Sequence, residues 1–164
     1  MGLRRVFDWI LVIWLIKNLF ITALVEDPVC RLGSDWPKHA SQNFLLQLSY
    51  DTVKELDPLF VQLPEWLRWA TCLHEYIFAP SYALLALCIA ARWGKATRLI
   101  SLWLGPSLAY AVGFYTVLEF WGSVPTPDPV MWSIINLDYF VVALLLPFLS
   151  WRHLSGDRTK LHAQ

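Results

Sequence analysis

Four apolar stretches, each long enough to cross a lipid bilayer, constrain this chain more than any other feature of its sequence. A bilayer core needs roughly 20 consecutive, mostly apolar residues in a helix. The stretches cover residues 6–25, 67–90, 99–121 and 130–151. Only 16% of the residues are charged, whereas an average soluble domain carries about a quarter. The pattern therefore predicts an all-α, polytopic membrane protein with a bundle of four transmembrane helices.

The same stretches leave little of the 164-residue chain for anything else. We therefore expect one membrane domain over residues 1–164 and no separate soluble domain. Asp8 and Lys17 interrupt the first stretch and no A-x-A-like cleavage site follows it, so it predicts a retained helix rather than a signal peptide. The formal net charge is zero, and the absence of a basic stripe argues against nucleic acid as a partner.

Positive charges alternate from one connection to the next. Lysine and arginine accumulate in cytosolic loops because their translocation is unfavourable. Two arginines precede the first stretch, the connection at 91–98 carries three positive charges and no acid, and the tail is basic. The connection at 122–129 has no positive charge, and the long loop at 26–65 has more acids than lysines and arginines. This bias predicts cytosolic N- and C-termini and a luminal loop at 26–65.

Tryptophans and an amphipathic segment mark the predicted membrane surfaces. Several tryptophans lie near predicted helix ends, as an interfacial belt would place them: Trp66, Trp69, Trp93, Trp121, Trp132 and Trp151. Trp14 and Trp103 lie deeper and are the better candidates for lining a pocket. In the long loop, apolar residues recur near helical spacing over 41–56, which predicts a short amphipathic helix at the membrane surface. Pro64-Glu65-Trp66 is expected to start the second spanning helix.

Ionisable groups inside the predicted helices are the strongest functional candidates, because a charge in the bilayer is costly and usually faces an interior or a cavity. They are Lys17, Glu26, Asp27, His74, Glu75, Glu119 and Asp138. With a rise of about 1.5 Å per residue, the carboxylates all fall in the luminal half of the bundle. Glu26, Glu119 and Asp138 also allow a plainer interpretation, as solvated helix ends or packing groups.

Helical angles relate some of these groups to one another. At about 100° per residue, Trp14, Asn18 and Thr22 form a polar stripe that is expected to face the bundle and to take part in ligand binding. Lys17 lies on the opposite side of this helix from Glu26. Because Lys17 matches the depth of Glu75, the sequence favours an ion pair between these two residues.

Two glutamates and a histidine in an apolar cavity are compatible with two kinds of site. One protonated group could donate a proton while another accepts one, which would make Glu26, His74 and Glu75 catalytic. The same groups could instead hold a cationic or hydroxylated ligand, and the residue types leave both alternatives open. No His, Cys or Asp grouping has metal-ligand spacing, so we predict no metal and no cofactor. Cys72 and Cys88 lie in predicted helices, where we expect small core residues.

Several short motifs resemble the EXPERA family of membrane proteins. They are Ile21-Thr-Ala-Leu-Val-Glu26 at the end of the first helix, Asp57-Pro-Leu59 in the loop, and Pro64-Glu-Trp66 leading into a helix with Cys72 and Glu75. The likeness is nearest to the sigma-2-receptor branch and more distant to the sterol-isomerase branch of emopamil-binding proteins. It covers nearly the whole chain in length, order and four-helix layout.

The resemblance implies roles for individual residues of the ligand site. Glu26 would meet the cation of a ligand, with Asp27 beside it as a competing candidate, and Glu75 would support this contact. Asp57 would order the luminal cap. Lys17 departs from the pattern, and its fixed positive charge would weaken the attraction for cationic ligands. It would therefore favour a neutral sterol or terpenoid, or chemistry on one.

Three functions follow as expectations from these observations. The first is a sterol- or lipid-binding protein of the endoplasmic reticulum with a sigma-2-receptor-like role in sterol handling or trafficking. The alternative is a small isomerase or cyclase that acts on a sterol or terpenoid by carboxylate acid–base chemistry. The third is a purely structural membrane subunit. The expected partners are a lipophilic small molecule, such as a sterol or terpenoid, and membrane lipids. A second copy of the chain, forming a homodimer, is the protein partner considered. Lys160-Leu-His162-Ala-Gln164 in the tail resembles a Lys-x-His-x-x retrieval signal of this compartment.

Overall fold

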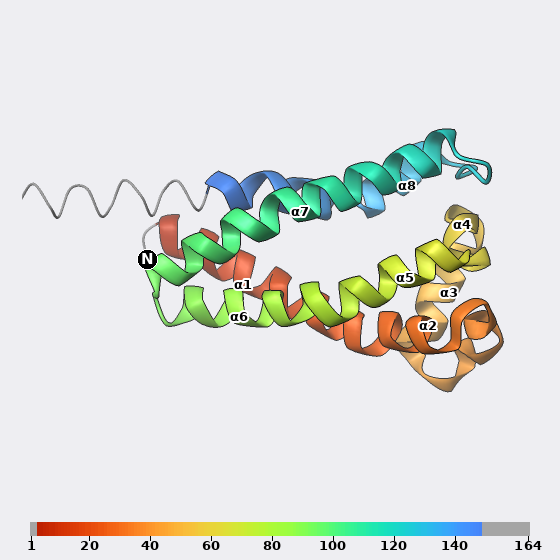
Figure 1. Ribbon diagram of the computed structural model, residues 1–164, viewed down its shortest axis with the longest axis horizontal. Helices are drawn as coiled ribbons and strands as arrows, with labels where there is room; N and C mark the ends of the chain where they lie inside the picture. The colour runs from red at the N-terminus through yellow and green to blue at the C-terminus, as the bar shows by residue number, and fades with distance from the viewer. Residues whose placement is uncertain (1–2, 149–164) are drawn as a thin grey trace, which may run out of the picture.

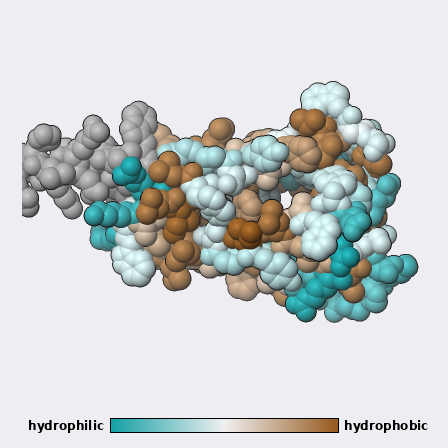
Figure 2. Space-filling view, in the orientation of Figure 1, coloured by the Kyte–Doolittle hydropathy of each residue, from teal (hydrophilic) through white to brown (hydrophobic). Residues whose placement is uncertain are grey.

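The computed structural model describes residues 3–148, and every regular element in that range is a helix. Figure 1 shows the long helices running side by side along one axis, with a group of short helices at one end. Hydrophilic residues concentrate at the two ends of this axis, and the surface between them is mostly apolar or intermediate (Figure 2). The structure therefore confirms the predicted all-α membrane class.

Three helical stretches are long and apolar enough to cross a membrane, and a bent pair of helices makes a fourth candidate. In chain order, the stretches are α1 (Leu3–Ile21) with η1 (Thr22–Glu26) and α2 (Asp27–Leu32), α5 (Glu65–Leu73) with η3 (His74–Phe78) and α6 (Ala79–Ala90), and α7 (Gly94–Trp121). The bent pair is α8 (Pro129–Ile135) and the final helix Leu137–Phe148, which meet at an angle of 49°. The spans predicted at 6–25, 67–90 and 99–121 thus correspond to continuous helical stretches, and residues 149–151 of the fourth lie outside the described range.

The order of the helices in space follows the predicted alternation. Figure 1 shows the start of α1 and the turn between α6 and α7 at one end of the molecule. The connection after α7 and the short helices after α2 lie at the other end. Helix α7 approaches the final helix closely at Gly105, where a Cβ atom would lie 2.7 Å from Cδ of Pro147. A side chain there would force the two helices apart.

The main hydrophobic core joins α1, α6, α7 and the final helix. Its most deeply buried members are Leu15, Tyr82, Leu85, Leu104, Leu108 and Leu146. A fully buried aliphatic side chain contributes roughly 1.5–3 kcal/mol through the hydrophobic effect when it is buried from water. In a bilayer the gain comes mainly from close packing instead, because lipid tails are as apolar as these side chains.

A second core lies under the short helices, which together form a cap over one end of the bundle. These elements are α2, the 3₁₀ segment η2 (Gly33–Gln42), α3 (Phe44–Leu56) and α4 (Pro58–Gln62). Trp36 is fully buried among them and its ring meets those of Tyr50 and Phe60 edge to face. The amphipathic helix predicted at 41–56 is confirmed as α3, which begins where the Asn43 side chain accepts a hydrogen bond from the backbone N–H of Leu46 (2.7 Å).

A disulfide between Cys30 and Cys72 ties the cap to the second spanning stretch. It joins α2 to α5, and Arg68 on α5 donates a hydrogen bond to the carbonyl of Cys30 beside it (2.8 Å). The interpretation of Cys72 as a plain core residue is therefore wrong, whereas Cys88 is buried with a free thiol, as expected. The disulfide closes a loop with a sequence separation of 42 residues, for which a chain-entropy model gives a stabilisation of about 4 kcal/mol.

Most tryptophans of the predicted belt are exposed near helix ends, and one is not. Large parts of the side chains are exposed at Trp66, Trp69, Trp93 and Trp121. Trp132, in contrast, is 2% exposed. The bend between α8 and the final helix places α8 at the end of α7, where Trp132 packs against Tyr115 and Phe120. Trp151 lies outside the described residues.

Candidate functional site

Three polar side chains form a hydrogen-bonded row between the first two spanning stretches. A carboxylate oxygen of Glu26 lies 2.5 Å from Nδ1 of His74, and Nε2 of His74 lies 2.9 Å from the hydroxyl of Tyr82. The ring of His74 also stacks on Phe78. If Glu26 is ionised, Nδ1 carries a proton, and a neutral His74 then accepts the Tyr82 hydrogen bond through Nε2. A carboxylate that orients an imidazole in this way is a recurrent arrangement in acid–base sites.

Two π-helical turns bring Glu26 and His74 together. Glu26 is the last residue of η1 and His74 is the first residue of η3, and the two turns contact each other. A π turn adds a residue to the helical repeat and rotates the following side chains, and such turns often occur at functional sites. The Cys30–Cys72 disulfide holds the same two stretches together one turn farther toward the cap. The row therefore depends on features of the backbone that a regular α-helix would not provide.

A second polar group surrounds Asp138 near the start of the final helix. One carboxylate oxygen of Asp138 accepts hydrogen bonds from Nε1 of Trp14 (2.9 Å) and from Nζ of Lys17 (2.5 Å). The predicted ion pair between Lys17 and Glu75 is therefore wrong. The break at Asn136, between α8 and the final helix, directs Asp138 toward α1. Depth along straight helices could not reveal this direction.

The polar stripe predicted on the first helix does face the interior of the bundle. Asn18 and Thr22 are almost fully buried, and Trp14 is 9% exposed. Asn18 donates to the carbonyl of Trp14 (2.9 Å) and accepts from the hydroxyl of Tyr139 (2.6 Å). Thr22 donates to the carbonyl of Asn18 (2.7 Å). These bonds leave the Asn18 side chain well satisfied in an apolar environment.

Trp14 connects the Glu26 row with the Asp138 group. Its ring meets those of Tyr82 and Tyr139 edge to face, with centroid distances of 5.8 and 5.4 Å. We call the combined set the polar cluster; it consists of Trp14, Lys17, Asn18, Glu26, His74, Tyr82, Asp138 and Tyr139. The cluster brings together four predicted ligand-binding residues of α1 and η1 with one from the final helix, Asp138, and with the catalytic candidate His74.

The structure separates Glu26 from the competing candidate Asp27. Asp27 forms an ion pair with Arg31 one turn along α2, outside the polar cluster. Glu75 lies near both groups, within electrostatic range of Asp27, Glu26 and His74. Its side chain is partly buried, and one carboxylate oxygen makes no hydrogen bond within the described part of the chain. Glu75 thus borders the polar cluster without joining its hydrogen bonds.

Asp57 lies in a separate polar group between the cap and α7. Its carboxylate accepts a hydrogen bond from the backbone N–H of Phe60 (2.8 Å), which caps the start of α4. The hydroxyl of Tyr115 lies 2.8 and 2.9 Å from the two carboxylate oxygens. Glu119 is fully buried beside this pair. Asp57 therefore sits where it can order the cap, as the resemblance implies, but it does not touch the polar cluster.

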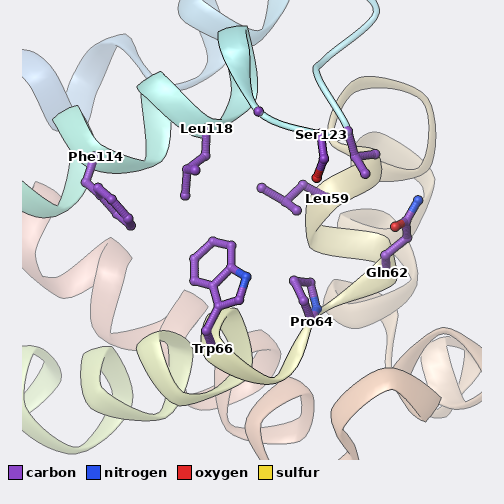
Figure 3. Close-up of a pocket in the computed structure, with 9 residues that line it drawn as sticks. Leu59, Gln62, Pro64, Trp66, Phe114, Leu118 and Ser123 are labelled. Atoms are coloured by element: carbon purple, nitrogen blue, oxygen red, sulfur yellow. The ribbon is translucent and has the colours of Figure 1, made fainter.

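A cavity of about 420 Å³ opens next to this group, between α4, the start of α5 and the end of α7 (Figure 3). Leu59, Trp66, Phe114 and Leu118 supply much of its apolar wall. No residue of the polar cluster lines it. The cavity therefore lies beside the Asp57 group and apart from the polar cluster.

No protein-family model, no curated protein and no solved structure matches this chain. The candidate site is therefore defined by its geometry alone. Sequence reasoning missed Tyr82 and Tyr139, which supply hydroxyl groups to the cluster. A buried tyrosine normally finds a hydrogen-bond partner for its hydroxyl, so tyrosines inside predicted spans are the signal that could have found them.

Proposed function

We propose that this chain is a multi-pass protein of the endoplasmic reticulum membrane that binds a sterol or another lipophilic small molecule, with a role in sterol handling or trafficking. The polar cluster is the observation that carries this proposal. Ionisable side chains within spanning helices are expensive and usually have a function. Here a carboxylate and an imidazole lie between the spanning helices, and a partly exposed ion pair lies on the same bundle.

The charges of the polar cluster favour a ligand without net charge. Lys17 offsets Asp138, and Glu26 is hydrogen-bonded to His74. An added cationic ligand would have to compete with Lys17 or with His74 for these carboxylates. The hydroxyl group of a lipophilic ligand needs only one hydrogen-bond donor or acceptor. His74 or Tyr82 can supply it if their hydrogen bond to each other is replaced by one to the ligand. This argument supports sterols and terpenoid alcohols over amines.

We further propose that both termini are cytosolic and that the cap is luminal. The distribution of lysine and arginine supports this orientation. The Cys30–Cys72 disulfide supports it independently, because disulfides persist in the lumen of the endoplasmic reticulum and are rare in the cytosol. The compartment itself rests on the family resemblance. The tail motif at Lys160 and His162 lies outside the described residues.

The orientation predicts the accessibility of two exposed positions. Ser34 lies in the cap and Lys95 lies at the start of α7, and both side chains are exposed. In sealed microsomes, a membrane-impermeant maleimide should label Lys95→Cys at once and Ser34→Cys only after permeabilisation. The two variants serve as controls for each other. Labelling of Ser34→Cys in intact vesicles would overturn the orientation.

A second candidate function is an isomerase or cyclase of sterols or terpenoids, and the row Glu26–His74–Tyr82 favours it. In such a reaction, one group donates a proton to a carbon–carbon double bond or an epoxide oxygen. Another group removes a proton from a neighbouring carbon, so that the composition of the substrate does not change. His74, oriented by Glu26, is the residue suited to transfer a proton here, and Tyr82 is its hydrogen-bonded neighbour.

Product analysis separates these functions. Purified protein in lipid nanodiscs is incubated with a panel of sterols and terpenoids, and the extracts are compared by gas chromatography and mass spectrometry. Saturable binding with unchanged ligand supports the binding protein. A new isomer or cyclised product that requires the protein supports the enzyme. If no member of the panel binds saturably, both proposals fail and a structural role remains.

A further inference from the structure

The cavity beside the cap is lined mostly by apolar side chains. Proline, tryptophan and phenylalanine side chains line it, and none of its lining residues is ionisable. Trp66 from α5 and Phe114 from α7 meet edge to face across it, with a centroid distance of 6.3 Å. Its volume of about 420 Å³ lies within the usual range for small-molecule sites, roughly 300–1,000 Å³. A flexible charged headgroup has nothing to bind here, whereas a rigid uncharged ring system has flat surfaces to contact.

Two polar side-chain groups face this cavity. Figure 3 shows the Ser123 hydroxyl and the indole nitrogen of Trp66 directed toward the space beside Leu59. Gln62 lies farther out, at the rim. A hydroxyl can act as donor or acceptor and an indole N–H only donates, so together they match one alcohol group. The cavity thus offers a small polar end and a larger apolar body.

The position of the cavity also fits an amphiphile that comes from the bilayer. Figure 1 shows the start of α5 and the end of α7, which both contribute to the cavity wall, at the end of the bundle that carries the cap. The exposed side chains of Trp66 and Trp121 indicate the depth of the membrane interface. An alcohol at this depth would remain near water while its hydrocarbon body lay between the helices.

We propose that this cavity binds the hydroxyl-bearing end of an uncharged ring lipid, a sterol or a terpenoid alcohol, at a site separate from the polar cluster. The proposal rests on the proposed function for its class of ligand. It uses different residues, because Trp66, Phe114, Leu118 and Ser123 supply the site and no member of the polar cluster contributes. The cavity would then be a second site, at the membrane interface, in addition to the deeper one at the polar cluster.

Neighbouring positions on α7 allow a matched test. Leu118 points into the cavity, whereas Val117 is 52% exposed on another face of the same helix. The probe is a cholesterol analogue with a photoreactive diazirine, applied to the full chain in nanodiscs. Leu118→Trp should fill the cavity and reduce saturable photolabelling of the peptides that line it at least tenfold, and Val117→Trp should leave this labelling within about twofold. Labelled peptides of the wild type should include residues from the start of α5 and the end of α7.

A second variant covers the case in which Leu118→Trp does not fold. Trp66→Phe combined with Ser123→Ala keeps the apolar wall and removes the two polar groups. Loss of two hydrogen bonds should weaken the affinity for the probe about tenfold or more. Unchanged affinity in this variant, or unchanged labelling in a folded Leu118→Trp protein, would overturn the proposal while the proposed function survived.

Two further outcomes distinguish the possible failures. If the wild type labels only within α1 and α6, the lipophile binds at the polar cluster and the cavity proposal is wrong. If a photoreactive phospholipid labels the cavity as strongly as the sterol probe, the site does not select ring lipids and the proposal is wrong as well. Absence of saturable binding across the sterol and terpenoid panel would overturn the proposed function itself.

Discussion

Glu26→Gln is expected to weaken the binding of the lipophilic ligand about 10- to 100-fold, or to lower turnover at least as much if the protein is an enzyme. Glu26 orients His74 through a short hydrogen bond, and a hydrogen bond to a charged group contributes about 1.5–3 kcal/mol. Glutamine keeps the shape of the side chain but carries no charge, so its hydrogen bond to the imidazole is weaker. Equilibrium binding of a radiolabelled ligand from the panel, in nanodiscs, measures this effect.

Asp27→Asn is the matched control for this prediction. Asp27 is the adjacent acid, and it pairs with Arg31 rather than with His74. The affinity of the Asp27→Asn variant should therefore stay within about threefold of the wild type. The pH profile of binding should also change in Glu26→Gln and not in Asp27→Asn, because only the first substitution alters the surroundings of the imidazole. Equal losses in both variants would contradict the assignment of Glu26.

Lys17→Met is expected to destabilise the protein by about 1.5 kcal/mol. The substitution removes the ammonium group that contacts Asp138 and leaves this carboxylate with Trp14 as its remaining side-chain donor. A hydrogen bond to a charged group contributes about 1.5–3 kcal/mol, and the partial exposure of this pair places the loss at the lower end. Reversible unfolding in mixed micelles measures the change. Lys95→Met, at an exposed position of α7, should change the stability by less than about 0.5 kcal/mol.

A double variant tests which acid Lys17 contacts. Lys17→Met combined with Asp138→Asn should recover most of the lost stability, because asparagine is neutral and still accepts a hydrogen bond from Trp14. Lys17→Met combined with Glu75→Gln should recover none of it. Rescue by the Glu75 substitution instead would show that the contact with Asp138 does not form in the membrane.

The sequence predicted the elements of this fold that depend on local pattern. Continuous apolar length identified the spanning stretches, because a helix must be about as long as the bilayer core to cross it. Near-helical spacing of Leu45, Leu48 and Val53 identified α3 in the loop. Pro64 marked the start of α5, which begins at Glu65. None of these predictions required knowledge of how the helices pack.

The pairing of polar groups depended on packing and could not be predicted in the same way. Lys17 and Glu75 match in depth, but depth does not specify the direction of a side chain. The break at Asn136 directs Asp138 toward α1, and the π turns at Glu26 and His74 rotate these residues away from a regular helical register. Angles counted along a straight helix therefore gave the correct stripe on α1, whereas matching depth gave the wrong partner for Lys17.

The disulfide was not predicted, because its pairing also depends on how the chain packs. Cys30 and Cys72 are 42 residues apart, and the path of the cap decides whether they meet. Cysteine in a spanning helix usually acts as a small apolar residue, which is correct for Cys88 alone. Disulfides form readily in luminal segments. The predicted orientation places both Cys30 and Cys72 toward the lumen, so the two observations together could have predicted the disulfide.

Ligand-dependent stability tests the central claim most directly, namely that the polar cluster belongs to a site for a lipophilic molecule. The unfolding free energy of the wild type is measured in mixed micelles with each sterol or terpenoid of the panel. A ligand at 100 times its dissociation constant should stabilise the folded protein by about 2.7 kcal/mol, and Glu26→Gln should lose most of this gain at the same concentration. A wild type that gains no stability from any member of the panel, or gains as much from a saturated phospholipid, would contradict the claim.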